Sequence, residues 1–152
     1  MSLSVYGEKF FNLLNTNAPA ATFVIRLLPG LVFFAEGIKK FILPADWGAG
    51  RFEKIGIIYP SLTGPFVGVV ETVCGLLLVI GLFTRPAALL LLIDISVALL
   101  TTKLPILMHK GFWPVEDAAR TDYSMFMSTL FLLIVGGGVI SLDAWWAKKR
   151  KG

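Results

Sequence analysis

Residues 61–108 read SLTGPFVGVVETVCGLLLVIGLFTRPAALLLLIDISVALLTTKLPILM, which is two long apolar segments joined by a tight turn. The segments cover about 61–84 and 86–108, and each is long enough to cross a hydrocarbon core about 30 Å thick. Pro86 follows the turn and suits the first turn of a helix. Because the link is so short, we expect the two helices to be antiparallel neighbours.

Two further apolar segments flank this pair, at about 20–42 and 123–142. The last one carries no charge and is bounded by Asp122 and Asp143. A soluble helix of this length would present a polar face, and these segments mostly lack one. The sequence therefore predicts an all-α integral membrane protein, a four-transmembrane-helix bundle that forms one domain over residues 1–152.

The composition agrees with a protein that is solvated by lipid. Of the 152 residues, 56% are apolar and 16% are charged, whereas soluble domains are about 45–50% apolar and about a quarter charged. These values argue against a cytosolic enzyme, a disordered segment or a nucleic-acid-binding domain. The single cysteine, Cys74, excludes a paired-thiol site, and the single histidine, His109, excludes a haem held between two histidines. We predict no metal site and no intrinsic cofactor.

Short interfacial helices are expected at two places. Near the N-terminus, apolar residues recur at helical spacing: Leu3, Tyr6, Phe10, Leu13 and Leu14. The link 44–60 repeats the pattern with Phe52, Ile55 and Tyr59. The basic tail 148–151 favours a cytoplasmic C-terminus, and an even number of spans then places both termini in the cytoplasm.

Ionisable residues inside the spans mark the candidate site. A charge at mid-bilayer costs at least about 2.5–3.5 kcal/mol, so Arg26, Glu71 and Asp94 should face the bundle interior and find partners. From their depths we expect an ion pair between Arg26 and Asp94, with no cation for Glu71. Glu36 and Lys40 are secondary members of this polar cluster. The alternative is that these groups only hold the helices together.

Glycines lie on one face of each of the first two spans. Gly30 and Gly37 share a helix face with Arg26, and Gly68 and Gly75 share a face with Glu71. In membranes such glycines usually mark close helix packing. They are also a candidate cofactor-binding face, because they could leave room for a flat ligand.

Four groups of residues resemble the DoxX family of small membrane proteins, in this order along the chain: Arg26-x3-Gly30-x2-Phe33-x3-Gly37-x2-Lys40, Gly68-x2-Glu71-x3-Gly75, Gly81-x3-Arg85-Pro86-Ala87 and Gly138-x2-Ser141-Leu142-Asp143. The likeness covers roughly residues 23–145. It implies a four-helix bundle in the inner membrane of a bacterial cell. It also implies relatives that serve as the membrane subunit of thiosulfate:quinone oxidoreductase, or that belong to redox and thiol-stress complexes.

Three hypotheses for the function follow. The first is a membrane subunit for quinone-linked redox chemistry, in which the buried cluster bonds a quinone carbonyl and relays protons. The sequence contains no recognisable electron carrier, so a protein partner or a bound substrate must supply electrons. The second is a noncatalytic accessory subunit that anchors a larger complex. The third, a small-molecule transporter, is less favoured because no inverted repeat is visible. Expected partners are the lipid bilayer and a protein partner or a second copy of the chain.

Overall fold

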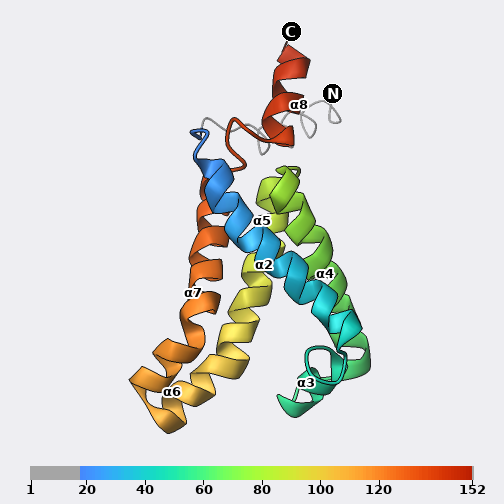
Figure 1. The fold of residues 1–152 in the computed structure, drawn as a ribbon, viewed down its shortest axis with the longest axis vertical. Helices are drawn as coiled ribbons and strands as arrows, with labels where there is room; N and C mark the ends of the chain where they lie inside the picture. The colour runs from blue at the N-terminus through green and yellow to red at the C-terminus, as the bar shows by residue number, and fades with distance from the viewer. Residues whose placement is uncertain (1–17, 152) are drawn as a thin grey trace, which may run out of the picture.

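The computed structural model describes residues 18–151 and is helical throughout, with no strand in that range. Figure 1 labels most of the elements: α2 (Thr22–Ile42), α3 (Ala49–Lys54), α4 (Pro60–Ile80), α5 (Thr84–Ala98), η1 (Leu99–Lys103), α6 (Leu104–Lys110), α7 (Phe112–Val135) and α8 (Leu142–Lys151). The interfacial helix predicted from Leu3 to Leu14 lies outside the described residues. The helix predicted in the link 44–60 is present as α3, although it is short and ends before Ile55 and Tyr59.

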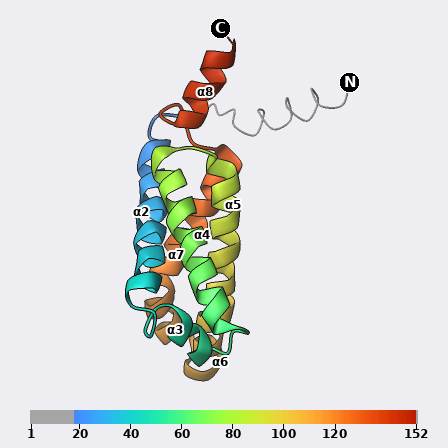
Figure 2. The same cartoon turned by 90° about the vertical axis from the view of Figure 1, so that its right-hand side faces the viewer.

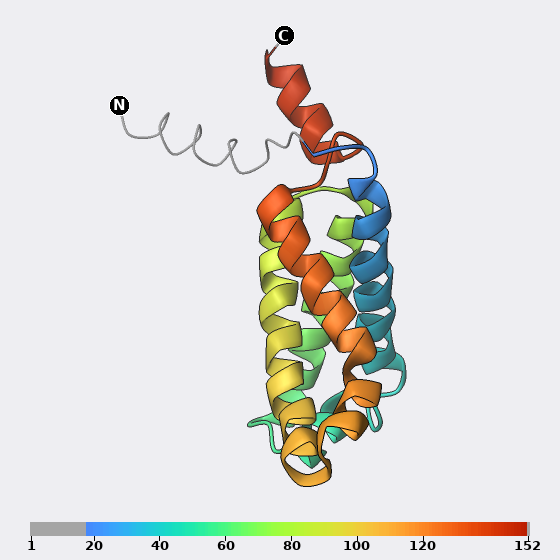
Figure 3. The ribbon, with the colours of Figure 1, turned by 90° about the vertical axis from the view of Figure 1, so that its left-hand side faces the viewer.

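The long helices form a bundle, and the short ones lie at its two ends. α2, α4, α5–α6 and α7 run side by side (Figure 2). α3 lies at the end where α6 turns into α7, and α8 projects from the opposite end (Figure 3). α2 packs on α4 and α7, and α5 packs on the same two helices. α4 and α7 therefore connect α2 to α5 across the bundle.

Glycines explain the extensive contact between α2 and α4. A Cβ atom on Gly37 would lie 2.4 Å from Thr72 Oγ1 and 2.6 Å from Thr72 N. A Cβ atom on Gly75 would lie 2.6 Å from Phe34 N. These positions must stay glycine for the two backbones to approach this closely, which is the packing that small residues allow in membrane helices.

Apolar side chains fill the centre of the bundle and also cover its outside. The buried core includes Phe33, Leu78, Leu91 and Leu132. Large apolar side chains are exposed on every long helix, among them Val24, Leu62, Phe66, Leu100 and Ile134. Helices that are apolar on both faces suit burial or contact with lipid.

Two of the four predicted spans are apolar enough along their length to cross a membrane: α4 and the continuous run Thr84–Lys110. They correspond to the predicted segments 61–84 and 86–108. α2 carries four charged side chains, and so does the first half of α7. For these two helices, composition alone does not establish a span.

The apolar segment predicted at about 123–142 coincides only in part with one helix. α7 begins at Phe112 and ends at Val135, and a loop follows. Gly136 and Gly138 have φ values of +88° and +79°, which glycine adopts without the steric penalty of other residues. The glycines at positions 136–138 therefore end the helix inside the predicted apolar segment.

Candidate functional site

A cavity of about 390 Å³ lies between the bundle helices and reaches α3. Its walls include apolar side chains of α2, α5 and α7, such as Val32, Phe33, Ile95 and Met125. It is also lined by seven charged residues: Glu36, Lys40, Arg51, Glu71, Asp94, Lys103 and Asp122. The cavity thus combines apolar walls with charged groups, the combination that small-molecule sites usually show.

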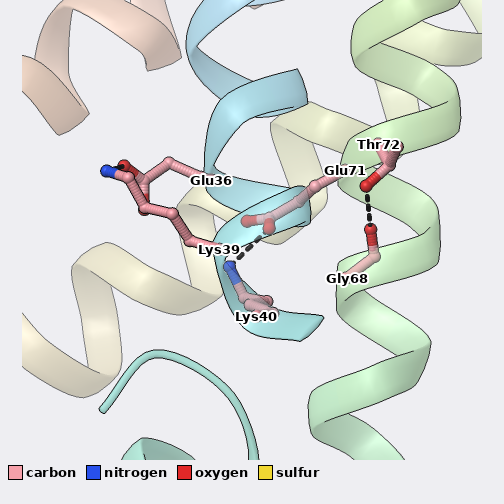
Figure 4. Close-up of polar contacts among 6 residues, drawn as sticks. All are labelled: Glu36, Lys39, Lys40, Gly68, Glu71 and Thr72. Carbon is pink, nitrogen blue, oxygen red and sulfur yellow. Dashed lines mark hydrogen bonds and ion pairs between the residues drawn. The ribbon is translucent and has the colours of Figure 1, made fainter. Parts of the chain in front are cut away.

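A buried ion pair joins α2 to α4 in this cavity. Lys40, in the last turn of α2, donates from Nζ to Oε2 of Glu71, near the middle of α4 (Figure 4). Their side chains are only 10% and 8% exposed. Gly68 lies one turn before Glu71, and a Cβ atom there would be 3.3 Å from Lys40 Cβ. The ring of Phe41 would be closer still, at 2.9 Å, so the glycine makes room for both side chains. The expectation that Glu71 has no cation is wrong.

Asp94 brings a second carboxyl group to this pair from α5. It interacts with both Glu71 and Lys40, and it lines the same cavity. We call Lys40, Glu71 and Asp94 the polar triad. The polar triad thus places one ammonium donor and two carboxyl groups beside the cavity.

Two further ion pairs lie around the polar triad. Lys103 of η1 contacts Asp122 of α7 at 2.9 Å, with side chains 18% and 24% exposed. Glu36 contacts Lys39 at 2.7 Å (Figure 4). Asp122 was predicted only to bound the apolar segment 123–142, and Lys103 was not predicted as part of the site. Lys103 is a charged residue within the apolar segment 86–108, and this was the signal that could have identified it.

Arg26 does not join the polar triad, so the predicted ion pair with Asp94 is wrong. Its Nη1 donates to the carbonyl of Gly137 at 2.6 Å, and its Nη2 to the carbonyl of Val79 at 3.4 Å. Val79 is in the last turn of α4, where carbonyl groups lack helical partners. The carbonyl groups of Val79 and Gly137 therefore lie beside Arg26. Asp94 does not, because it is on α5, which packs on α4 and α7 on the opposite side of the bundle from α2.

Asp143 binds the turn between α4 and α5 at the same end of the bundle. Its two carboxylate oxygens accept from the backbone N–H groups of Phe83 and Thr84, at 2.8 and 2.9 Å. Its own N–H donates to the carbonyl of Gly81 at 3.0 Å. We call Arg26, Gly137 and Asp143 the C-terminal seam, because they join α2, the α4–α5 turn and the segment after α7. From the sequence, Asp143 was predicted only to bound the last apolar segment.

The candidate cofactor-binding face of glycines is filled by protein. None of its four members lines the cavity: Gly30, Gly37, Gly68 and Gly75. A Cβ atom on Gly30 would already lie 2.9 Å from Val79 Cγ2. Space for a ligand is therefore found beside the polar triad, on the side of α4 that faces α5, and not along the glycine face.

The fold and the cavity define an all-helical membrane protein with a charged cavity inside its bundle. The chain belongs to the DoxX family, whose family model matches residues 21–104, and the resemblance found in the motifs is confirmed. An "Uncharacterized membrane protein" of Mycobacterium tuberculosis is 47% identical over 90% of this chain and 88% of its own length. No solved structure matches the chain.

Two more distant relatives differ in what their names say. "Putative oxidoreductase CatD" of Bacillus subtilis is 26% identical over 91% of this chain and 96% of its own length. An "Uncharacterized protein" of Haemophilus influenzae is 31% identical over 82% of this chain and 90% of its own length.

Proposed function

We propose that this protein is a membrane subunit of a quinone-linked redox complex, and that its cavity binds the quinone ring. The observation that supports this most directly is the polar triad in an apolar-walled cavity of about 390 Å³. A quinone ring needs flat apolar walls and a few polar groups that reach its carbonyl oxygens. CatD, the relative whose name proposes an oxidoreductase, is consistent with this class of function.

The polar triad has the groups that reduction of a quinone requires. The reaction adds two electrons and two protons to the quinone and gives the quinol. Lys40 donates a hydrogen bond to one carbonyl oxygen, and Asp94 and Glu71 hold and transfer protons. The single cysteine cannot form an internal dithiol, so the electrons come from a donor molecule or a partner protein. With thiosulfate as donor, two thiosulfate ions yield the two electrons and one tetrathionate.

We propose four membrane spans, formed by α2, α4, α5–α6 and α7, with both termini in the cytoplasm of a bacterial cell. Aromatic side chains are exposed at both ends of the bundle, as in membrane-interface belts: Phe112 and Trp113 at one end, Trp145 and Trp146 at the other. The charges of α2 fit a span because Arg26 is only 2% exposed and Lys40 is paired. In this orientation the α3 end of the cavity is on the outer side of the membrane.

The test is quinol formation by the purified protein in lipid nanodiscs. Thiosulfate and decylubiquinone serve as substrates, with and without the neighbouring gene product. We expect Glu71→Gln and Asp94→Asn to lower turnover about 100-fold, in the range of general acid–base catalysis. Glu53→Gln is the matched control, because Glu53 is an exposed carboxylate on α3 that does not line the cavity. Absence of turnover in every combination, together with no binding of decylubiquinone, would rule out the proposal.

A noncatalytic anchoring subunit is the second candidate function. The C-terminal seam favours it, since there the buried charges contact backbone groups and serve to join helices. Extraction in a mild detergent, followed by identification of copurifying proteins and lipophilic molecules, separates the two candidates. A stoichiometric large partner without quinone supports the anchoring role, and a bound quinone supports the redox role.

A further inference from the structure

The charged groups of the cavity are not all paired. Lys40 pairs with Glu71, Lys103 with Asp122, and Glu36 with the neighbouring Lys39. Arg51 also lines the cavity, yet within the described part of the chain its guanidinium makes no ion pair and no hydrogen bond. Its recorded contact is with an aromatic ring: Cζ lies 5.2 Å from the centre of Trp47.

Trp47 contacts two cationic side chains, Arg51 and Lys39, at the α3 end of the cavity. Nζ of Lys39 lies 4.9 Å from the centre of the same ring, and Trp47 itself lines the cavity. Stacking on an aromatic ring orients a guanidinium while its N–H groups remain available to bind an acceptor. Arg51 is therefore a cation with free donors beside a flat apolar surface.

The backbone around Arg51 is held tightly against the bundle. A Cβ atom on Gly64 of α4 would lie 2.8 Å from the backbone N of Ala49, and one on Gly48 would lie 2.6 Å from the carbonyl oxygen of Lys40 in α2. Phe52, next to Arg51, is buried at 9% exposure. Arg51 thus lies on a short helix that is packed on the bundle, rather than on a loose surface segment.

We propose that Arg51 and Trp47 bind an anionic substituent, so that the ligand of this cavity is a flat ring that bears a carboxylate or sulfonate group. A planar guanidinium matches the two oxygens of such a group with two parallel hydrogen bonds. The polar triad lies farther inside the bundle and hydrogen-bonds the oxygen atoms at the other end of the ring. The inference rests on the proposed function in that it assigns the substrate class of the same cavity.

Three probes test the proposal by calorimetric titration in a neutral detergent: 1,4-naphthoquinone, 1,4-naphthoquinone-2-sulfonate and naphthalene-2-sulfonate. We expect the sulfonated quinone to bind about tenfold more tightly than the neutral one. Arg51→Gln removes that preference, and Arg51→Lys restores only part of it, because an ammonium group lacks the planar fork. Lys54→Gln is the matched control: it removes an exposed cation of α3 outside the cavity and leaves the preference intact.

The outcomes separate this inference from the proposed function. If both quinones bind equally, or if Arg51→Gln keeps the preference, the anion site is refuted while quinone binding stands. A second outcome is that naphthalene-2-sulfonate binds through Arg51 and that neither quinone has a higher affinity than this probe. The anion site then stands, and the quinone function fails. Absence of binding by all three probes overturns both. A circular dichroism melt verifies that each variant is folded.

Discussion

The C-terminal seam and the polar triad are both buried and charged, yet they satisfy their charges in different ways. In the seam, Arg26 donates to backbone carbonyls and Asp143 accepts from backbone N–H groups. In the polar triad, side chains interact with one another inside a cavity. A buried charge that contacts the backbone is fixed in place and supports the fold. Charged side chains that contact each other beside open space can exchange partners with a ligand.

The largest effect on stability is expected from the seam. Arg26→Ala removes the donors for two carbonyl groups and leaves a buried space, at a cost of about 3 kcal/mol in the free energy of unfolding. Asp143→Ala removes the cap of α5 and should cost about 2 kcal/mol, while Asp143→Asn costs less because its amide oxygen still accepts. Thermal melts in one detergent measure all three. Asp117→Ala, at an exposed position on α7, is the control, and equal melting of Arg26→Ala and the parent would refute the structural role.

The glycine contact between α2 and α4 comes next. Gly37→Ala places a methyl group against backbone and side-chain atoms of Thr72, so the helices must separate, at a cost of about 2 kcal/mol. Ala35→Leu on the same helix adds more volume but points outward, and it should leave the melting temperature nearly unchanged. If both variants melt alike, the close approach of the two helices is not important for stability.

The polar triad should respond asymmetrically to loss of its members. Lys40→Met leaves two carboxyl groups without their cation and should cost about 1–3 kcal/mol. Glu71→Gln should cost less than about 1 kcal/mol, because Lys40 can then interact with Asp94. The double variant Lys40→Met/Glu71→Gln should recover part of the loss, and a double-mutant cycle from thermal melts gives the coupling energy. Strictly additive losses would contradict a coupled triad.

The smallest effect is expected for the exposed ion pairs of α7. Arg120 contacts Glu116 and Asp117, but its side chain is 64% exposed. Arg120→Gln should therefore change stability by less than about 0.5 kcal/mol. The melting temperature measured beside that of Arg26→Ala tests the comparison directly, because both variants remove one arginine from the chain.

The sequence predicts helices well here and contacts between helices less well. Length and apolar composition were sufficient to find α4 and α5–α6, since both have a high mean hydropathy. Depth along a helix did not identify the partner of Arg26, because it does not say which helices are neighbours. Lys40 and Glu71 were both candidates, but their pairing follows from the α2–α4 contact. Arg51 was missed because the helical spacing in the link 44–60 comes from its apolar residues and does not indicate that a cavity lies beside them.

The contact between Arg26 and Gly137 also constrains the order of assembly. The two residues are 111 positions apart, so the first long helix is synthesised well before its acceptor exists. During translation the guanidinium of Arg26 must remain near water or lipid headgroups. It can enter the bundle only when α7 and the following loop arrive. Closure of this end of the protein is therefore a late step, and nascent chains that stop before Gly137 should lack the contact that fixes the Arg26 end of α2, although α2 and α4 can already pack together.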